Sequence, residues 1–212
     1  MFGIFKSKYN LINSGLMKGM TDVHSHVLPG VDDGSPDINA SLSLLRYMES
    51  IGLRKVWLTP HIMEDIPNTT DTLKTRFRTL CESYRGNIRL ELAAEYMLDN
   101  LFVRRLETDD ILPLHEEKRY LLVETSYFNP PMRLLSMLKH IQEKGYHPLL
   151  AHPERYEYMQ MADYKALQQA GVAFQLNIPS LAGMYGKHVQ KKAEALQAVS
   201  YTHLRAHETS LH

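Results

Sequence analysis

The sequence predicts an α/β fold in which parallel strands alternate with helices. Short segments rich in β-branched and aromatic residues alternate six times with longer segments of helical periodicity. Gly52, Gly145 and Gly171 each follow a helical segment just before a strand-like one, where a left-handed residue ends a helix. The chain has 212 residues and 44% hydrophobic content, enough for one sizeable core. Such a series of β/α units is typical of a parallel sheet, open or closed into a barrel.

The elements are expected in the following order along the chain. Strand-like segments, short and rich in residues of high β-propensity, occupy residues 20–26, 54–61, 88–97, 119–126, 147–154 and 172–181. Helical periodicity covers residues 35–52, 71–86, 100–107, 132–145, 162–171 and 187–198. The first helix starts at Ser35-Pro36, a pair suited to a cap and a first turn.

Composition excludes several classes of protein. Lys+Arg and Asp+Glu both count 24, so the net charge indicates neither a nucleic-acid nor a membrane-surface partner. The single cysteine, Cys81, excludes an internal disulfide, and its helical surroundings favour a small buried side chain over a reactive thiol. No apolar run approaches the roughly 20 residues of a membrane span. The first twenty residues lack a signal-peptide core, so a cytoplasmic protein is expected.

Residues of the types that bind metal ions stand at or near the carboxyl ends of five successive predicted strands. They are His24, His26, His61, Glu95, Glu124 and His152. In a β/α barrel all these strand ends open onto one face, and that face holds the active site. One such residue alone is more often solvated or hydrogen-bonded than a ligand, but five consecutive strands with the same feature predict a shared metal site.

Five motifs carry a resemblance to a known family. They are DVHSHVLPGVDDGS (22–35), TPH (59–61), AAEYM (93–97), LVETS (122–126) and AHPERY (151–156). Together they resemble the polymerase-and-histidinol-phosphatase (PHP) superfamily, and within it the bacterial manganese-dependent protein-tyrosine phosphatases of capsule and exopolysaccharide systems. The resemblance covers roughly residues 20–198. H-x-H alone is a weak signal, but H-x-H with GVDDG and AHPERY is specific.

The resemblance implies a distorted β/α barrel of seven units with up to three divalent ions at its carboxyl mouth. By position, it assigns His24 and His26 to one ion, Glu124 and His152 to a second, Glu95 as the bridge, and Asp33 and His61 to a third. Asp32 is adjacent to Asp33 and is taken as a turn residue, since the family motif places its ligand at Asp33.

The chemistry of these side chains agrees with that assignment. Imidazole and carboxylate without thiolate suit Mn²⁺, Fe²⁺ or Zn²⁺ better than Ca²⁺ or Mg²⁺ alone. The resemblance to the manganese-dependent phosphatases implies Mn²⁺ among these, with Fe²⁺ or Zn²⁺ as alternatives. Clustered divalent ions bind phosphoryl oxygens and supply hydroxide near neutral pH, so no cysteine nucleophile is needed. Arg155, three residues after His152, is placed to grip a phosphate dianion. Its alternative role is a salt bridge with Glu154 or Glu157.

Three functions are compatible with the sequence. The favoured one is a metal-dependent phosphomonoester hydrolase that dephosphorylates phosphotyrosine on bacterial tyrosine kinases of polysaccharide synthesis and export. The second is a histidinol-phosphate phosphatase of the same superfamily, and the third is a non-catalytic metal-binding module. The pair GVDDG and HPERY favours the first over the second, and the retained ligand-type residues weaken the third.

The end of the chain departs from the family. The family has a seventh strand with Asp-x-His, and no such motif occurs after residue 178. The segment VSYTHLRAHETSLH (199–212) resembles a non-native read-through, so a single domain is expected at residues 1–199, incomplete at its carboxyl end, followed by a non-native tail at 200–212. This polar tail is expected to pack poorly, to leave the last barrel unit missing and to keep His203 and His207 away from the metal site.

Overall fold

The structure is a computed structural model of the chain, and it describes residue 15 and residues 17–115, 117–198 and 204–206. The strands in these residues are β1 (Thr21–Ser25), β2 (Lys55–Leu58), β3 (His61–Ile62), β4 (Arg89–Leu92), β5 (Glu95–Met97), β6 (Tyr120–Glu124), β7 (His147–Ala151), β8 (Ala173–Asn177) and β9 (Leu204–Ala206). The helices are α1 (Ile38–Ser50), α2 (Thr70–Ser83), α3 (Asn100–Thr108), α4 (Leu134–Glu143), α5 (Met161–Gln169), α6 (Ile178–Leu181) and α7 (Lys187–Ala198), with a 3₁₀ turn at Pro153–Arg155.

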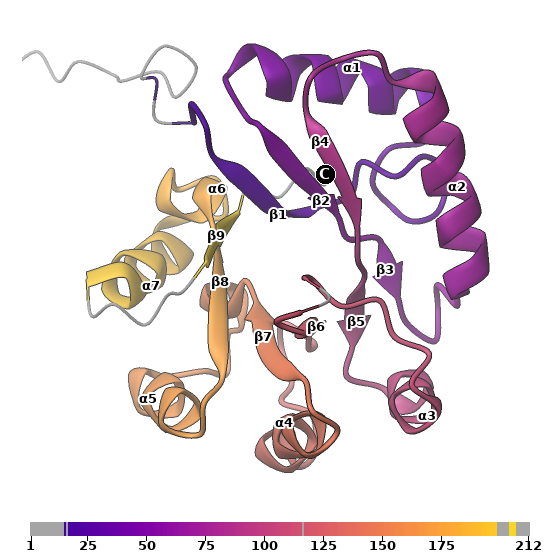
Figure 1. Cartoon of the computed structure of the whole chain (residues 1–212). Coiled ribbons are helices and arrows are strands. Elements are labelled where there is room, and N and C mark those ends of the chain that lie inside the picture. Colours follow the sequence, from indigo (N-terminus) through magenta and orange to yellow (C-terminus); the bar gives the residue numbers. More distant parts are fainter. Residues whose placement is uncertain (1–14, 16, 116, 199–203, 207–212) are drawn as a thin grey trace, which may run out of the picture.

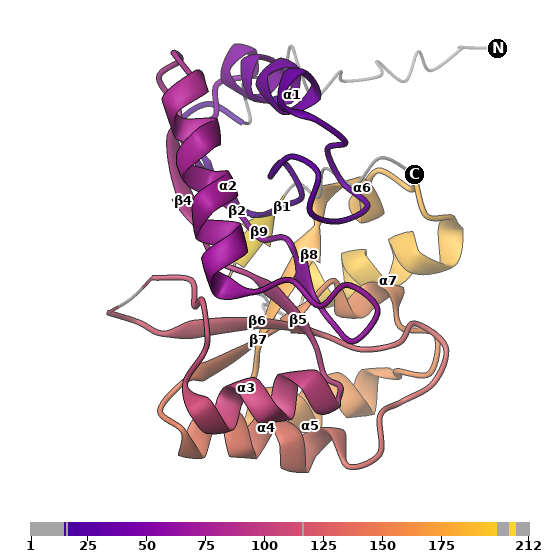
Figure 2. The same ribbon diagram turned by 90° about the vertical axis from the view of Figure 1, so that its right-hand side faces the viewer.

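The strands form two sheets in which every pairing is parallel. The order is β1-β2-β4 in one sheet and β3-β5-β6-β7-β8-β9 in the other. The longer helices lie on the outside of the strands, and α3, α4 and α5 pack along one side of β5, β6 and β7 (Figures 1 and 2). The predicted α/β class with parallel strands is confirmed.

Two of the expected strands are each divided in two. The expected strand at 54–61 becomes β2 and β3, separated by Thr59 and Pro60, because proline has no N–H to donate to a ladder. The expected strand at 88–97 becomes β4 and β5. The two backbone segments stay side by side across both gaps. The N–H of Ala93 donates to the carbonyl of Leu58 (2.9 Å), and the N–H of Glu95 donates to the carbonyl of Pro60 (3.1 Å). Each pair of short strands therefore carries the chain from one sheet to the other.

The expectation that the tail adds no strand is wrong for residues 204–206. These residues form β9, which pairs with β8 in the register Gln175↔Leu204 to Asn177↔Ala206 and lies beside β1. Parallel pairing uses only backbone N–H and C=O groups, so a polar segment can extend an open sheet edge. The position of a seventh strand is therefore occupied. The non-native origin of residues 200–212 is a separate prediction, and the position of β9 does not test it.

Two further expectations need correction. The cap of α1 is Asp37 and not Ser35, because the Asp37 carboxylate accepts hydrogen bonds from the N–H groups of Asn39 and Ala40 (2.8 and 2.9 Å). Cys81 is exposed and not buried, because the apolar face of α2 is turned inward at Leu73 and Leu80. Desolvation by the packing around it and the neighbouring Glu82 raise the pKa of its thiol, which disfavours the reactive thiolate.

The core consists of two hydrophobic clusters on either side of the strands. The larger packs the inner faces of the helices, including Leu45, Leu73 and Leu138, against the sheets. The smaller gathers side chains from successive strands, among them Val23 and Trp57. Because both faces of the strands are covered, polar side chains at the strand ends are held in a dry environment.

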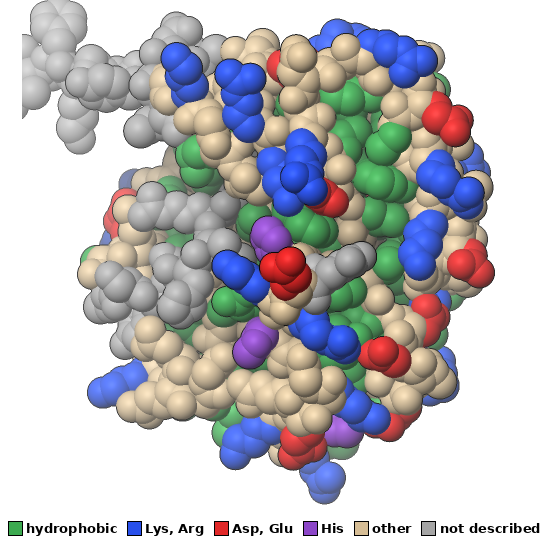
Figure 3. Space-filling view, in the orientation of Figure 1, with side chains coloured by type: hydrophobic (Ala, Val, Ile, Leu, Met, Phe, Trp, Pro, Cys, Tyr) green, Lys and Arg blue, Asp and Glu red, His purple; other side chains and the backbone are tan. Residues whose placement is uncertain are grey.

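The surface and the helix ends agree with the sequence. Side chains of both charge signs occur on the face seen in Figure 3. The glycines that were expected to end helices, Gly52, Gly145 and Gly171, all adopt positive φ. Within the described residues, no helix combines the length and the apolar character needed to cross a lipid bilayer.

Candidate metal centre

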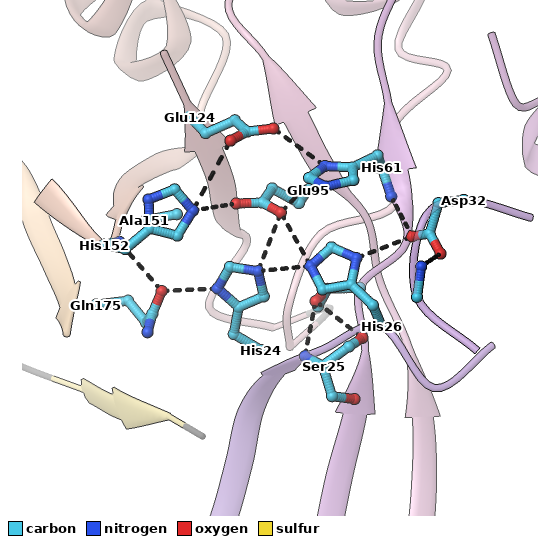
Figure 4. Close-up of polar contacts among 12 residues, drawn as sticks. His24, Ser25, His26, Asp32, His61, Glu95, Glu124, Ala151, His152 and Gln175 are labelled. Atoms are coloured by element: carbon cyan, nitrogen blue, oxygen red, sulfur yellow. Dashed lines mark hydrogen bonds and ion pairs between the residues drawn. The ribbon is translucent and has the colours of Figure 1, made fainter. Parts of the chain in front are cut away.

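The side chains of the six strand-end residues meet at one place in the structure (Figure 4). His24 lies in β1 and His26 follows it, while His61 and Glu95 begin β3 and β5. Glu124 ends β6 and His152 follows β7; these six residues come from positions up to 128 residues apart. Five of the six are buried, and His61 is partly exposed. The parallel topology therefore brings them together as the sequence predicted.

Glu95 lies at the centre of the cluster, in contact with four imidazoles. Its Oε2 atom lies 3.0 Å from His24 Nε2, 3.3 Å from His26 Nε2 and 3.2 Å from His61 Nδ1. Its Oε1 atom lies 3.1 Å from His152 Nε2. Such a carboxylate, fully buried and surrounded by nitrogen atoms, is a natural bridge between cations.

Glu124 closes the opposite side of the cluster. Its Oε1 lies 3.0 Å from His61 Nδ1 and its Oε2 lies 3.8 Å from His152 Nε2. Because one carboxylate spans two imidazoles that also touch Glu95, the two acids and their histidines form a continuous set of ligand atoms. Three groups of these residues bring their ligand atoms within 4.8 Å of one another; they are His24-Glu95-His152, His26-His61-Glu95 and His26-Asp32-Asp33.

Hydrogen bonds at Nδ1, on the side of the ring away from Glu95, fix the orientation of two of the imidazoles. His24 Nδ1 donates to Gln175 Oε1 (2.7 Å), and His26 Nδ1 donates to the carboxylate of Asp32 (2.8 Å). With both Nδ1 atoms used as donors, the neutral rings turn their Nε2 lone pairs toward Glu95. These two Nε2 atoms lie only 3.1 Å apart. Two nitrogen atoms and a carboxylate that face one another in a dry interior favour a positive charge between them, so the residues fit a divalent metal ion.

The pKa values of the cluster show the same demand for positive charge. Burial alone would lower the pKa of His26, but Asp32 and Glu95 hold it well above 6.5. Burial would also lower the pKa of His61, yet Glu95 and Glu124 raise it to about 9. Burial acts to raise the pKa of Glu95, but the neighbouring histidines hold it well below its usual range. These shifts have one direction: the carboxylates favour positive charge at the neighbouring imidazoles, as they would favour a bound cation.

The backbone at His152 is strained. Its φ of 32° and ψ of 49° lie in the left-handed region, which is unusual for a residue other than glycine and is further disfavoured before Pro153. The conformation points the imidazole back toward Glu95, and the His152 N–H is directed at Gln175 Oε1 (3.3 Å). Strain of this kind persists where the surrounding structure holds a functional side chain in place.

The two aspartates of the GVDDG motif have different positions. The buried carboxylate of Asp32 accepts hydrogen bonds from His26 Nδ1 (2.8 Å), the N–H of His61 (3.1 Å) and the N–H of Gly34 (3.0 Å). Asp33 is more open, with a side chain 47% exposed and an Oδ1 atom 3.6 Å from His61 Nε2. Asp33 therefore faces the cluster from its outer side, and Asp32 does more than shape a turn.

Arg155 lies at the edge of the cluster between two aromatic rings. Its Cζ atom is 4.5 Å from the centre of the Tyr127 ring and 4.4 Å from that of Tyr185. The Tyr127 ring in turn lies 5.6 Å from the imidazole of His152. The contacts with Tyr127 and Tyr185 are cation–π contacts, and they hold the guanidinium beside the cluster. The neighbouring acid Glu154 is fully buried, and its carboxylate accepts a hydrogen bond from the N–H of Asn177 (3.0 Å).

Sequence reasoning missed two residues of this site and undervalued a third. Gln175 links His24 to the backbone of His152, and Tyr185 holds one face of Arg155. Asp32 was assigned only to a turn. The one available signal for Gln175 was an amide in the middle of the apolar segment VAFQLN, where a buried polar side chain needs partners. Tyr185 lies between α6 and α7 without any pattern to mark it. The tail histidines His203, His207 and His212 lie outside the described residues.

Comparison with known proteins places this architecture in a family. The sequence model of the family described as "Capsular polysaccharide synthesis, CpsB/CapC" matches residues 20–210. The chain is 28% identical over 178 residues to the putative tyrosine-protein phosphatase CapC of Staphylococcus aureus, covering 81% of this chain and 69% of that protein. It is 29% identical over 189 residues to the tyrosine-protein phosphatase YwqE of Bacillus subtilis, covering 85% of this chain and 72% of YwqE.

A solved structure shares the fold. It comes from a study of YwqE from Bacillus subtilis and CpsB from Streptococcus pneumoniae, described as metal-dependent tyrosine phosphatases, and it superposes with a TM-score of 0.77 at 25% identity. The superposition covers 88% of this chain and 78% of that one. The resemblance seen in the sequence motifs is confirmed, and this chain belongs to the CpsB/CapC family of capsular polysaccharide synthesis.

Proposed function

We propose that this chain is a metal-dependent phosphomonoester hydrolase that removes phosphate from tyrosine residues of proteins. The observation that carries the proposal is the buried set of His24 Nε2, His26 Nε2 and the Glu95 carboxylate, which face one another at 3.0–3.3 Å. The names of the relatives support the substrate class, since YwqE is called a tyrosine-protein phosphatase and CapC a putative one. Exposed Cys81, with its raised pKa, offers no alternative nucleophile.

The residues of the cluster have three roles in such a reaction: they hold metal ions, orient the ligand histidines and bind the phosphate. His24, His26, Glu95, Glu124 and His152 would hold divalent ions, with His61 and Asp33 on the outer side. Bound metal ions supply Lewis acidity toward phosphoryl oxygens and a nucleophilic hydroxide near neutral pH. Gln175 and Asp32 keep the His24 and His26 rings in the tautomer that presents Nε2. Arg155 binds the phosphate from the edge of the cluster and orients it.

We infer Mn²⁺ as the working ion. A mixed imidazole and carboxylate set without thiolate suits Mn²⁺, Fe²⁺ and Zn²⁺. The resemblance of the sequence motifs to manganese-dependent phosphatases favours Mn²⁺ among them. The partner we infer is a tyrosine-phosphorylated protein of the cytoplasm, namely a bacterial tyrosine kinase that controls polysaccharide synthesis. The family to which the chain belongs supports this setting.

Metal removal and replacement test this function. After treatment with a chelator, the chain is expected to release no phosphate from a phosphotyrosine peptide, and Mn²⁺ is expected to restore turnover because the ligand cluster is intact without it. Histidinol phosphate measured in parallel is expected to be the poorer substrate. Turnover that persists without metal would contradict the proposal, and a preference for histidinol phosphate would favour the second function instead.

Arg155→Ala is expected to raise the KM for phosphotyrosine about 10- to 100-fold, because a charge-assisted hydrogen bond to a phosphate contributes about 1.5–3 kcal/mol. The bound metal, measured by mass spectrometry of the elements, is expected to stay constant, since Arg155 stacks on Tyr127 and Tyr185. Arg155→Lys should recover part of the loss, because lysine keeps the charge but lacks the planar fork. Loss of metal in Arg155→Ala would make the residue structural.

A further inference from the structure

Two tyrosine rings from separate segments contact the guanidinium of Arg155. Tyr127 follows β6, and Tyr185 lies in the loop between α6 and α7. The Arg155 Cζ atom lies over both rings, 4.5 Å from the centre of the Tyr127 ring and 4.4 Å from that of Tyr185. A long arginine side chain loses conformational entropy when it holds a phosphate in one geometry. The two contacts restrict the guanidinium beforehand, which lowers that cost.

These contacts leave the hydrogen-bond donors of Arg155 available to a ligand. A cation–π contact forms at the face of the aromatic ring and uses no lone pair. The five N–H donors of a guanidinium point outward in its plane, in the fork that pairs with two phosphate oxygens. A carboxylate partner would occupy the same donors, whereas a tyrosine ring does not. Aromatic rings are therefore suited to position an arginine that binds an anion.

The backbone that carries Tyr185 is fixed by a tight turn. The N–H of Gly186 donates to the carbonyl of Gly183 (3.1 Å), so Tyr185 occupies the third position of a four-residue turn. Both glycines have positive φ, 79° and 90°, which L side chains rarely adopt. The Gln190 side chain of α7 donates to the carbonyl of Leu181 in α6 (3.0 Å) and links the two helices around this turn. The loop itself therefore restricts the position of the tyrosine ring.

The turn at residues 153–155 is held by contacts of its own. The Tyr164 hydroxyl of α5 donates to the carbonyl of Pro153 (3.0 Å). The Lys192 ammonium of α7 donates to the carbonyl of Tyr156 (2.6 Å). Removal of the ring at position 185 should therefore release the arginine side chain and leave the backbone next to the metal ligand in place.

We propose that Tyr185 is a positioning residue whose ring, together with that of Tyr127, holds the Arg155 guanidinium where it meets the phosphate of the substrate. The inference rests on the proposed phosphatase function and on the phosphate-binding role of Arg155. The Tyr127 ring also lies 5.6 Å from the His152 imidazole, so a substitution there would disturb a metal ligand as well. Tyr185 therefore gives the more specific test.

Tyr185→Ala is expected to raise the KM for a phosphotyrosine peptide about three- to tenfold, the effect of losing one partly buried cation–π contact. The kcat is expected to change less than about twofold, because the guanidinium binds the phosphate in the ground state and the transition state alike. The Kd of inorganic phosphate, measured by titration calorimetry of the Mn²⁺-loaded chain, is expected to rise by the same factor as the KM. Tyr185→Phe keeps the ring and is expected to restore both values.

Substitution in an Arg155→Ala background separates a positioning role from a structural one. Tyr185→Ala is expected to have no further effect on the KM or on the phosphate Kd there, since the ring acts through the guanidinium. The bound metal, measured by mass spectrometry of the elements, is expected to stay constant in every variant. Tyr47→Ala, at a tyrosine 45% exposed on α1, is the matched control and should leave the KM and the Kd unchanged in both backgrounds.

An unchanged KM in Tyr185→Ala, together with a raised KM in Arg155→Ala, would overturn the positioning role and leave the proposed function standing. An equal loss in both backgrounds, or a loss of bound metal, would also overturn it, because Tyr185 would then be a structural residue. Absence of turnover in the wild type would overturn the proposed function, and the phosphate Kd values of the same variants would then decide the positioning role. A wild-type chain that binds no phosphate would overturn both.

Discussion

Glu95→Gln is expected to abolish metal binding and phosphatase activity together, with a fall in kcat/KM of at least about 100-fold. The reason is the position of the carboxylate, which touches His24, His26 and His61 through one oxygen and His152 through the other. Partners that merely orient metal ligands already contribute 10- to 100-fold, so a bridging ligand should contribute more. Glutamine has the same size, so the core should not open. Metal content and turnover on p-nitrophenyl phosphate are measured on the same sample.

Glu91→Gln provides the matched control for that substitution. Glu91 lies in β4, four residues before Glu95, and its carboxylate pairs with Lys55 (3.3 Å) and Arg89 (2.7 Å) away from the cluster. This variant is expected to keep wild-type metal content and kcat/KM, since partly exposed ion pairs contribute little. A Glu95→Gln variant that retains both metal and activity would show that Glu95 is not a ligand.

Asp32→Ala is expected to lower metal affinity about 10- to 100-fold, although Asp32 was predicted only to form a turn. Its carboxylate fixes the His26 ring and also accepts hydrogen bonds from the backbone N–H groups of His61 and Gly34. Without this carboxylate, nothing fixes the tautomer and orientation of the His26 ring. The backbone at His61 and at Gly34 also loses the acceptor that the two segments share. Isothermal titration of the metal-free variant with Mn²⁺ measures the change.

Asp33→Ala should have a different effect. Asp33 is half-exposed and reaches only the outer edge of the cluster, at His61 Nε2. We expect this variant to bind one ion fewer while the affinity of the buried ions changes little. If instead Asp33→Ala weakens every ion and Asp32→Ala none, the roles inferred from the structure are reversed.

The elements of the fold could be predicted because each carries its own local signal. Glycines at positive φ end α1, α4 and α5, and β-rich segments recur between the helices. The division of two strands at Pro60 and Ala93 could not be predicted, because it depends on how two sheets meet in space. The strand at 204–206 was missed for a related reason. Its pairing depends on an open edge beside β8 and not on its own apolar pattern.

The inner residues of the site could be predicted because parallel strands place their carboxyl ends together. That rule finds His24, Glu124 and His152 without knowledge of any contact. Gln175 supports a ligand histidine and Tyr185 packs on Arg155 from a loop, and neither position is marked by a periodic pattern in the sequence. Their positions follow from tertiary packing alone.

The prediction of a non-native tail remains open to test. The chain lacks the Asp-x-His that the family resemblance implies after residue 178. The ion assigned by that resemblance to His24 and His26 and the ion assigned to Asp33 and His61 should therefore bind more weakly than the ion assigned to Glu124 and His152. The family match nevertheless extends to residue 210. The number of tightly bound metal ions per chain therefore tests the prediction of a non-native tail as well as the metal centre.

The central claim, that the buried cluster around Glu95 is a metal centre, is tested most directly by anomalous X-ray diffraction from crystals of the Mn²⁺-soaked chain at the manganese edge. The account predicts anomalous peaks about 2–2.5 Å from Glu95 and the facing nitrogens of His24 and His152. Absence of a peak at this cluster, or peaks only at His203 and His207, would contradict it.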